Sequence, residues 1–161
     1  MVREIILQNS DKVTLVDDED FVWLNIYKWY LSKNGYAVRD QYIGGKRYTL
    51  YMHKEITQRR MYINEEIDHE DRNKLNNQKE NLRIATRTQN HANREKYKRN
   101  SSGYKGVSWH NRNSKWVANI RINRKSIYIG SFEDIEEAAR AYDQKAKELF
   151  GEFACTNFPE I

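Results

Sequence analysis

The last third of the chain carries a helix pattern that restricts which folds are possible. In EDIEEAARAYDQKAKELF, residues 133–150, apolar side chains recur at intervals of three and four: Ile135, Ala138, Ala139, Tyr142, Ala146, Leu149 and Phe150. This spacing predicts an amphipathic helix with one continuous apolar side. Three runs typical of strands precede it, YKGVSWH (104–110), KWVANIRI (115–122) and KSIYIGSF (125–132). We therefore predict a two-layer unit, a three-stranded antiparallel sheet packed on one α-helix.

The middle strand of this predicted sheet separates two kinds of side chain. Because side chains alternate along a strand, the even-numbered residues from Trp116 to Ile122, which are apolar, should face the helix. The odd-numbered residues, among them Asn119 and Arg121, should face away from it and stay free to meet a partner.

Charge is unevenly distributed along the chain. The formal net charge is +5, yet residues 83–125 hold twelve Lys or Arg against one acid, a balance of +11, and residues 131–161 hold eight acids against three bases, a balance of −5. Four aromatic residues are interleaved with the basic run: Tyr97, Tyr104, Trp109 and Trp116. A solvated basic face without a function is the alternative, but cations mixed with aromatic side chains favour nucleic-acid binding.

Composition narrows the class of protein further. With 161 residues, 39% of them apolar, the chain can bury a core for one domain or two small ones. No apolar run approaches the roughly 18 residues of a membrane span, and no signal peptide is recognisable. We therefore expect a soluble protein that is not secreted and has no membrane partner, acting in the cytoplasm or nucleoid. The single Cys155 excludes an internal disulfide and a Cys-pair zinc site, so any metal should prefer oxygen and imidazole ligands.

Residues 1–60 should form a β-rich N-terminal region. Its strand-like runs are KVTLV, KWYLSK, GYAVRDQ and KRYTLYMHKEI, with turn signals at Gly35 and at Gly44 and Gly45. A short helix is expected within residues 17–28, and Trp23 and Trp29 should lie in the core. His53 falls in the last run. We expect a partly buried structural histidine there, with packing beside a site or a phosphate contact as the alternative.

Residues 61–98 form a second predicted segment, followed by a linker at 99–102 and the sheet-and-helix domain at 103–161. MYINEEIDH is typical of a strand that ends at His69, and NLRIA (81–85) of a second, short strand. A helix should open at Thr86, because Gln89 three residues later completes a capping box.

Asp68 and His69 together suit the hydrolysis of a phosphodiester bond. A neutral imidazole can take a proton from the attacking water, and a divalent cation can offset the charge that develops on the leaving oxygen. The two side chains should point to opposite sides of the strand, so that one can hold the metal and the other the water. Asn81 can keep one nitrogen of His69 protonated, and Asn90, one turn into the helix, can provide a second oxygen ligand.

This pattern resembles the ββα-metal motif of HNH endonucleases, in the form carried by phage and intron-type homing endonucleases. The likeness rests on Asp68-His69, the loop DRNKLNN (71–77), NLR (81–83) and the helix start at 86–90. It implies His69 as general base, Asn81 as its orienting amide, and Asp68 with Asn90 as ligands of Mg²⁺ or, alternatively, Mn²⁺. His91 stands next to Asn90 but points about 100° away on a helix. We expect phosphate contacts from three arginines near the motif, Arg83, Arg87 and Arg94. Three asparagines are expected to shape the loop: Asn73, Asn76 and Asn77.

Residues 102–159 resemble the plant Apetala/ethylene-response-factor DNA-binding domain, which also occurs beside HNH motifs in phage endonucleases. The likeness is carried by YKGV, KWVANI, YIGSF, EEAARAYD and the final NFP. It implies that the sheet lies in the major groove of double-stranded DNA, with contacts from the face opposite the helix. The implied contact positions are Lys105, Ser108, His110, Asn119, Arg121, Ser126 and Tyr128, with Arg112, Arg124 and Lys125 nearby. Three of them, Ser108, His110 and Ser126, replace arginines of plant members, so the plant target sequence does not carry over.

The sequence thus predicts an α+β protein that is a metal-dependent DNA endonuclease of the site-directed homing or nicking type. The C-terminal sheet would choose or anchor the site, and on the sequence alone residues 1–98 should keep weak nicking without it. The alternative is a non-catalytic sequence-specific DNA-binding protein or repressor with a degenerate HNH unit. RNA binding is disfavoured, because the free sheet face offers mostly Arg, Asn and Ser instead of stacking aromatic residues.

Overall fold

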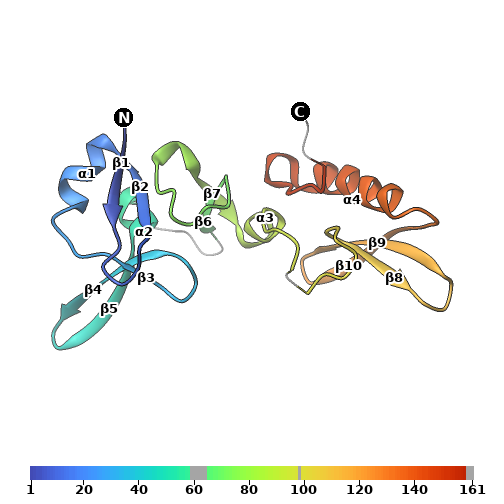
Figure 1. Cartoon of the computed structure of the whole chain (residues 1–161), viewed down its shortest axis with the longest axis horizontal. Helices are drawn as coiled ribbons and strands as arrows, with labels where there is room; N and C mark the ends of the chain where they lie inside the picture. Colours follow the sequence, from blue (N-terminus) through green and yellow to red (C-terminus); the bar gives the residue numbers. More distant parts are fainter. Residues whose placement is uncertain (59–64, 98, 159–161) are drawn as a thin grey trace. The chain divides into compact units, whose positions relative to one another are not determined.

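The computed structural model describes residues 1–58, 65–97 and 99–158. The chain forms two compact units, Met1–Ala85 and Thr86–Ile161, and each has its own hydrophobic core. Figure 1 shows the order of helices and strands, and the predicted α+β class is confirmed. In the described part of the chain, no helix is long and apolar enough to cross a membrane.

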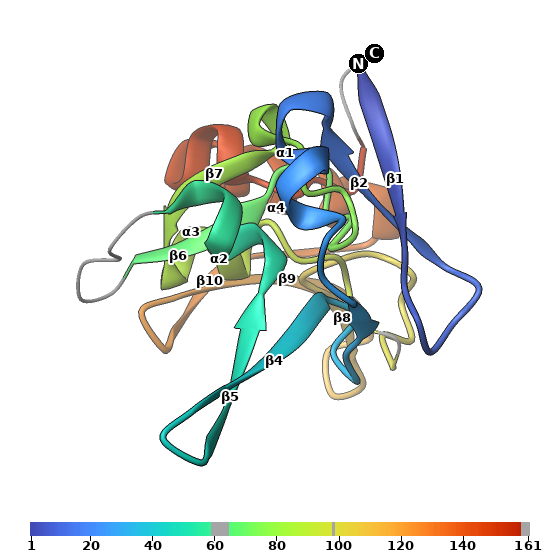
Figure 2. The same ribbon diagram turned by 90° about the vertical axis from the view of Figure 1, so that its left-hand side faces the viewer.

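Two antiparallel sheets begin the N-terminal unit. β1 (Val2–Ile6) pairs with β2 (Val13–Asp17), and α1 (Asp18–Leu24) follows. β3 (Tyr30–Leu31), β4 (Ala37–Ile43) and β5 (Lys46–Tyr51) form the second sheet in that order. The β4–β5 hairpin points away from α2 in Figure 2. The hairpin turns at Gly44 and Gly45, which have positive φ angles of 57° and 75° that glycine adopts without strain.

The core of the N-terminal unit forms where these elements meet. Leu7, Leu24 and Trp29 are fully buried, and the Trp29 indole N–H donates to the Leu24 carbonyl at 2.9 Å. The predicted core position of Trp29 is therefore confirmed. Trp23 is only partly buried, but it packs against the same cluster.

Two elements of this unit differ from the sequence expectation. The sequence of β1 has no alternation of buried and exposed side chains that would predict a strand, because only Ile5 of its five residues is buried. The run KRYTLYMHKEI, predicted as one strand, ends as a strand at Tyr51 and continues as α2 (Met52–Thr57), which places His53 on a helix. Met52 and Ile56 explain the change, since both are buried and their spacing of four residues suits one side of a helix.

A strand pair and a short helix occupy the segment that carries the chemistry-bearing residues. β6 (Glu65–His69) and β7 (Leu82–Thr86) form a two-stranded sheet, and the 3₁₀ helix η1 (Lys79–Asn81) leads into β7. The predicted strand ending at His69 is confirmed from Glu65 onward; residues 61–64 of that run lie outside the described residues. α3 (Arg87–Ala92) begins where predicted, and both hydrogen bonds of the Thr86–Gln89 capping box are present.

The C-terminal unit contains the predicted sheet and helix. β8 (Val107–His110), β9 (Lys115–Ile122) and β10 (Lys125–Phe132) are antiparallel in the order β10-β9-β8. α4 (Ile135–Phe150) lies across one face of this sheet (Figure 1). Ala118 and Ile120 of β9 are buried in its core, as alternation predicts.

Local contacts explain where α4 starts and how closely it packs. The Asp134 carboxylate accepts from the backbone N–H groups of Glu136 and Glu137 at 2.7 and 2.9 Å, which caps the first turn. Gly106 lies beside α4, and a Cβ atom there would come within 2.0 Å of the Tyr142 ring. Only glycine allows this approach. The 3₁₀ helix η2 (Gly151–Phe153) follows α4.

Candidate functional site

Asp68 and His69 lie at the end of β6, and both are buried, with 5% of each exposed. They have different neighbours, as expected for adjacent residues of a strand. The Asp68 carboxylate accepts from the Arg83 guanidinium of β7 at 3.1 Å, and that guanidinium also lies 3.7 Å from Glu70. Arg83, predicted as a phosphate contact, is thus engaged with the carboxylate of the site. Its contact with DNA remains a prediction.

The His69 ring sits among polar and aromatic side chains of the N-terminal unit. Its Nε2 lies 3.3 Å from the Asn77 side-chain oxygen, and its ring centre lies 5.2 Å from that of His53 and 5.9 Å from that of Tyr36. Burial lowers the pKa of His69, although Asn77, Asp71 and Asp68 act in the opposite direction. The imidazole is therefore biased towards its neutral form, the form that can accept a proton.

His53 packs directly beside His69. It is 6% exposed, and burial lowers its pKa to about 3, helped by the neighbouring His69 and Lys54. A neutral, buried ring agrees with the structural role expected for it. Its place beside His69 also agrees with the alternative, packing next to the site.

Asn81 and Asn77 have different partners from those that the sequence indicated. The Asn81 side chain accepts from the Asp71 N–H at 2.9 Å and donates to the Asp71 carboxylate and the Asn76 carbonyl at 2.9 and 2.8 Å. It therefore closes the loop between β6 and β7. The amide that contacts His69 is Asn77, which is 1% exposed. The orienting role of Asn81 remains a prediction, and Asn77 is a site residue that sequence reasoning assigned only to loop structure.

Asn90 lies on α3 in the C-terminal unit, half-buried, and the next residue, His91, is exposed. Among the residues that the structure describes, no three His, Cys, Asp or Glu side chains form a cluster suited to a metal. The expected ligands, the Asp68 carboxylate and the Asn90 amide, both offer oxygen atoms, which Mg²⁺ prefers. The donor types therefore fit a hard divalent cation, and both ligand assignments remain predictions.

Most of the predicted DNA-contact positions on the three strands share one face of the C-terminal sheet, whereas Lys125 lies opposite Ile122 at the start of β10. Residues directly opposite each other in antiparallel strands lie on the same face, and the register pairs Asn119 with Tyr128, Arg121 with Ser126, and Ser108 with Val117. Asn119 is half-buried, while the other predicted contacts on this sheet and its turns are exposed: Ser108, His110, Arg112, Arg121, Arg124, Lys125, Ser126 and Tyr128. The free face predicted from alternation is thus polar and accessible.

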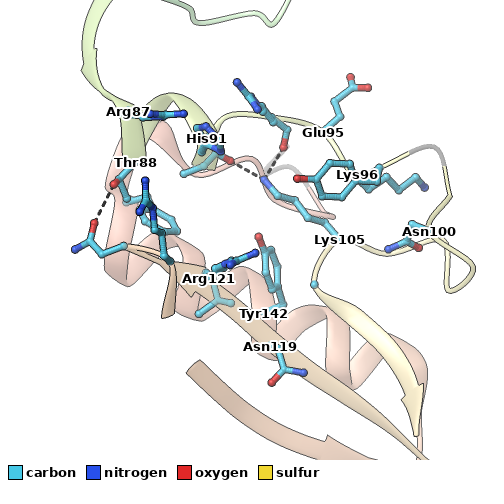
Figure 3. Close-up of a pocket in the computed structure, with 18 residues that line it drawn as sticks. Arg87, Thr88, His91, Glu95, Lys96, Asn100, Lys105, Asn119, Arg121 and Tyr142 are labelled. Atoms are coloured by element: carbon cyan, nitrogen blue, oxygen red, sulfur yellow. Dashed lines mark hydrogen bonds between the residues drawn. The ribbon is translucent and has the colours of Figure 1, made fainter. Parts of the chain in front are cut away.

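Lys105 has a different environment from these exposed residues. Its ammonium group donates to the carbonyls of Ala92 and Arg94, both at 2.6 Å, and to that of Cys155 at 3.4 Å. Figure 3 shows the bonds to the end of α3. Lys105 thus links α3 to the segment after α4. The contact with DNA expected for it remains a prediction, beside this structural role.

A cavity of about 760 Å³ lies within the C-terminal unit, lined by α3, the segment after it, and β9 (Figure 3). Thr88 on its wall donates to the Asn123 side chain at 3.0 Å. The wall carries one acid, Glu95, and six bases: Arg87, Arg94, Lys96, Lys105, Arg121 and Arg124. This composition gives the cavity a positive potential suited to phosphate. Its wall includes the predicted phosphate contacts Arg87 and Arg94.

The fold combines a ββα segment with a domain of one three-stranded sheet and one helix, and comparison with known proteins agrees with this arrangement. The HNH endonuclease family model matches residues 60–92, and the AP2 domain model matches residues 102–152. An uncharacterized HNH endonuclease of Acanthamoeba polyphaga mimivirus is 38% identical over 131 residues, covering 81% of this chain and 67% of that protein. The chain belongs to the HNH endonuclease family and carries a C-terminal AP2 domain.

Two further relatives match smaller shares of the chain. Protein 3.8 of Escherichia phage T7 is 36% identical over 88 residues, covering 55% of this chain and 72% of that protein. An ethylene-responsive transcription factor of Arabidopsis thaliana is 42% identical over 64 residues, or 38% of this chain and 15% of that protein. No solved structure matches the chain.

Proposed function

We propose that this protein is a metal-dependent DNA endonuclease that hydrolyses phosphodiester bonds in double-stranded DNA, as a site-directed homing or nicking enzyme. The observation that carries the proposal is the buried Asp68-His69 pair at the end of β6, with the His69 ring held by an amide. A carboxylate and a neutral imidazole placed together are the groups that this hydrolysis needs.

Each group of the site has a defined task in this proposal. His69 accepts the proton of the water that attacks phosphorus, and its lowered pKa keeps it competent at neutral pH. Asp68 and Asn90 would hold Mg²⁺ or Mn²⁺ through oxygen atoms. When bound, the cation supplies positive charge beside the leaving oxygen. Asn81 supports the base indirectly, because it fixes the loop that contains Asn77.

The AP2 domain would bind DNA through its free sheet face. Asn119 and Arg121 are suited to base edges in the major groove, and Lys125 at the β9–β10 turn to phosphate. If Arg121 reads a base, Arg121→Ala should cost about 1–3 kcal/mol at the preferred site and relax the choice of base there, whereas Lys125→Ala should weaken binding to all DNA alike. Binding selection on randomised DNA distinguishes the two effects.

The second candidate function is a non-catalytic DNA-binding protein or repressor with a degenerate HNH unit. It is favoured by the ion pair between Arg83 and Asp68, which engages an oxygen of the expected metal ligand. The joint presence of Asp68, His69, Asn81 and Asn90 favours the nuclease instead.

Plasmid nicking decides between the two candidates. Supercoiled DNA incubated with the full chain should become nicked or linear in Mg²⁺ or Mn²⁺, and a chelator should stop the reaction. His69→Ala should lower the rate by about 10²–10⁴-fold with DNA affinity within a few fold, and Asp68→Ala should abolish the metal-dependent cleavage. His91→Ala is the matched control and should cut normally. Wild-type protein that binds DNA and leaves the plasmid intact would establish the non-catalytic reading.

A further inference from the structure

A chain of hydrogen bonds joins His69 to strand β2, far away in the sequence. His69 Nε2 lies 3.3 Å from Asn77 Oδ1, Asn77 Nδ2 lies 2.7 Å from Thr14 Oγ1, and Thr14 Oγ1 lies 2.8 Å from the Leu75 carbonyl oxygen. Thr14, Asn77 and His69 are 0%, 1% and 5% exposed. At such buried positions each hydrogen-bond donor needs an acceptor and each acceptor needs a donor. The direction of every hydrogen bond in the chain can therefore be worked out.

Backbone hydrogen bonds around Asn77 fix the position from which its side chain extends. The Asn77 N–H donates to the Leu15 carbonyl at 2.8 Å, and the Leu15 N–H donates to the Leu75 carbonyl at 2.7 Å. These bonds lay the loop beside β2 as a short parallel bridge. Asn77 is therefore held at both its backbone and its side chain.

Thr14 determines which end of the Asn77 amide faces His69. Its hydroxyl has one hydrogen, and the Leu75 carbonyl at 2.8 Å and the Met52 sulfur at 3.7 Å can only accept it. The Thr14 oxygen must therefore accept from Asn77, which turns the amide NH₂ towards Thr14. The Asn77 carbonyl oxygen then faces His69, and an oxygen can only accept a hydrogen bond from the ring.

We propose that Asn77 and Thr14 are positioning residues that hold neutral His69 in one tautomer, with the proton on Nε2 and the accepting lone pair on Nδ1. Neutral imidazole carries a proton on one nitrogen only, so donation from Nε2 to Asn77 leaves Nδ1 as the base. The assignment of Nδ1 as the atom that takes the proton from water rests on the proposed nuclease function. The tautomer itself does not.

Nitrogen NMR of the full chain tests the tautomer without any cleavage assay. In metal-free protein labelled with ¹⁵N-histidine at pH 7.5, long-range ¹H–¹⁵N spectra distinguish the protonated from the bare ring nitrogen, and a His69→Gln sample identifies the His69 signals. We expect Nε2–H alone in the wild type and a mixture of tautomers in Asn77→Leu, which cannot accept a hydrogen bond. A wild-type His69 ring protonated on Nδ1 would overturn the proposal. So would the same single tautomer in wild type and in Asn77→Leu.

Variants of Thr14 form the matched pair for this site and keep the test decisive if Asn77→Leu does not fold. Thr14→Val removes the hydroxyl at nearly constant volume, and Thr14→Ser retains it. Thr14→Val should show mixed tautomers and lower the cleavage rate at saturating DNA about 10–100-fold, as loss of an orienting partner does elsewhere, with DNA affinity unchanged. Thr14→Ser should behave as wild type in both measurements.

The two readouts separate the possible failures. A single Nε2–H tautomer in Thr14→Val would overturn the role of Thr14, and a Thr14→Val enzyme as fast as Thr14→Ser would show that the tautomer does not limit catalysis. If the wild type shows the Nε2–H tautomer and never cuts DNA, the nuclease proposal fails while the positioning of His69 by Asn77 stands.

Discussion

His53 and His69 face each other as buried rings with centres 5.2 Å apart, and burial lowers the pKa of both. In the unfolded chain each histidine titrates at about 6.5. Below that pH the unfolded chain takes up protons that the folded protein cannot bind, so stability falls as the pH drops from about 6.5 towards the folded-state pKa, about 3 for His53. For His53 the slope approaches about 1.4 kcal/mol per pH unit in this range.

We therefore expect the urea concentration at the unfolding midpoint to decrease as the pH is lowered from 6.5 to 5. The decrease should be smaller in His53→Gln, which has no ring to protonate. His110→Gln is the control, because it removes a histidine that is exposed instead of buried. Urea titrations at pH 7.5, 6.0 and 5.0 measure this. Equal pH dependence in wild type and His53→Gln would show that His53 takes up its proton freely in the folded protein.

The same burial determines where the cleavage rate should depend on pH. From the sequence alone, the rate should rise through about pH 6.5 as His69 loses its proton. Because burial lowers the pKa of His69, the midpoint should lie below 6.5, and the rate should reach its plateau by neutral pH. Single-turnover cleavage from pH 5 to 8 measures the profile. A rate that still climbs between pH 7 and 8 would mean that another group accepts the proton.

The predictability of the site differs between its residues. The location of Asp68 and His69 at a strand end, with different neighbours for each, was predictable because side chains alternate along a strand; their roles in hydrolysis stay predictions. The contact between Asn77 and His69 was not, because the loop holds several asparagines that look alike in sequence. Asn77 differs from them only in being buried against Thr14, a tertiary contact 63 positions away along the chain.

The Lys105 ammonium group holds the end of α3 within the C-terminal unit by hydrogen bonds to three carbonyl oxygens. Lys105→Met keeps the apolar stem but removes the ammonium group that donates to these carbonyls, although the Ala92 carbonyl still accepts from the Cys155 N–H. We expect it to lower the unfolding free energy by about 1–3 kcal/mol, whereas Lys125→Met, at an exposed position, should change it by less than about 0.5 kcal/mol. Thermal unfolding compares the two. Unchanged stability with weakened DNA binding in Lys105→Met would instead make Lys105 a DNA contact.

The elements were predictable where one periodicity runs through a whole segment. β9 and α4 each keep a single pattern, β10 keeps strand-type residues although its register shifts between Tyr128 and Gly130, and for β9 and β10 the predicted ends coincide with the observed ones. The run at 46–56 changes from strand to helix at Met52 without a Gly or Pro to mark the change. Only the contacts of Met52 and Ile56 with the N-terminal core make the helix evident.

The boundary between the two compact units falls between Ala85 and Thr86, inside the segment that matches the HNH family. The two strands of the ββα segment belong to the N-terminal unit, while its helix α3 packs in the unit that contains the AP2 domain. Besides Lys105, the Cys155 N–H donates to the Ala92 carbonyl at 3.3 Å, and Thr88 donates to Asn123. The AP2 domain therefore supports the helix that carries Asn90.

This arrangement changes the expected result of truncation. The sequence alone suggested weak nicking by residues 1–98, but such a fragment lacks Lys105, Asn123 and Cys155, the partners that hold α3. A helix of six residues is far below the length of about 12–15 at which isolated helices become even marginally stable. We therefore expect residues 1–98 to keep the fold of the N-terminal unit and lose metal-dependent cleavage, not merely target selectivity.

Nicking of one plasmid by the full chain, by residues 1–98 and by residues 86–161 tests this dependence, with circular dichroism of each fragment as the folding control. Residues 86–161 retain the sheet face and should bind DNA and cut nothing. Cleavage by residues 1–98 at a rate near that of the full chain would mean that α3 forms without the AP2 domain. If the AP2 domain supports α3 as well as binding DNA, residues 1–98 should keep the fold of the N-terminal unit and should not cleave the plasmid.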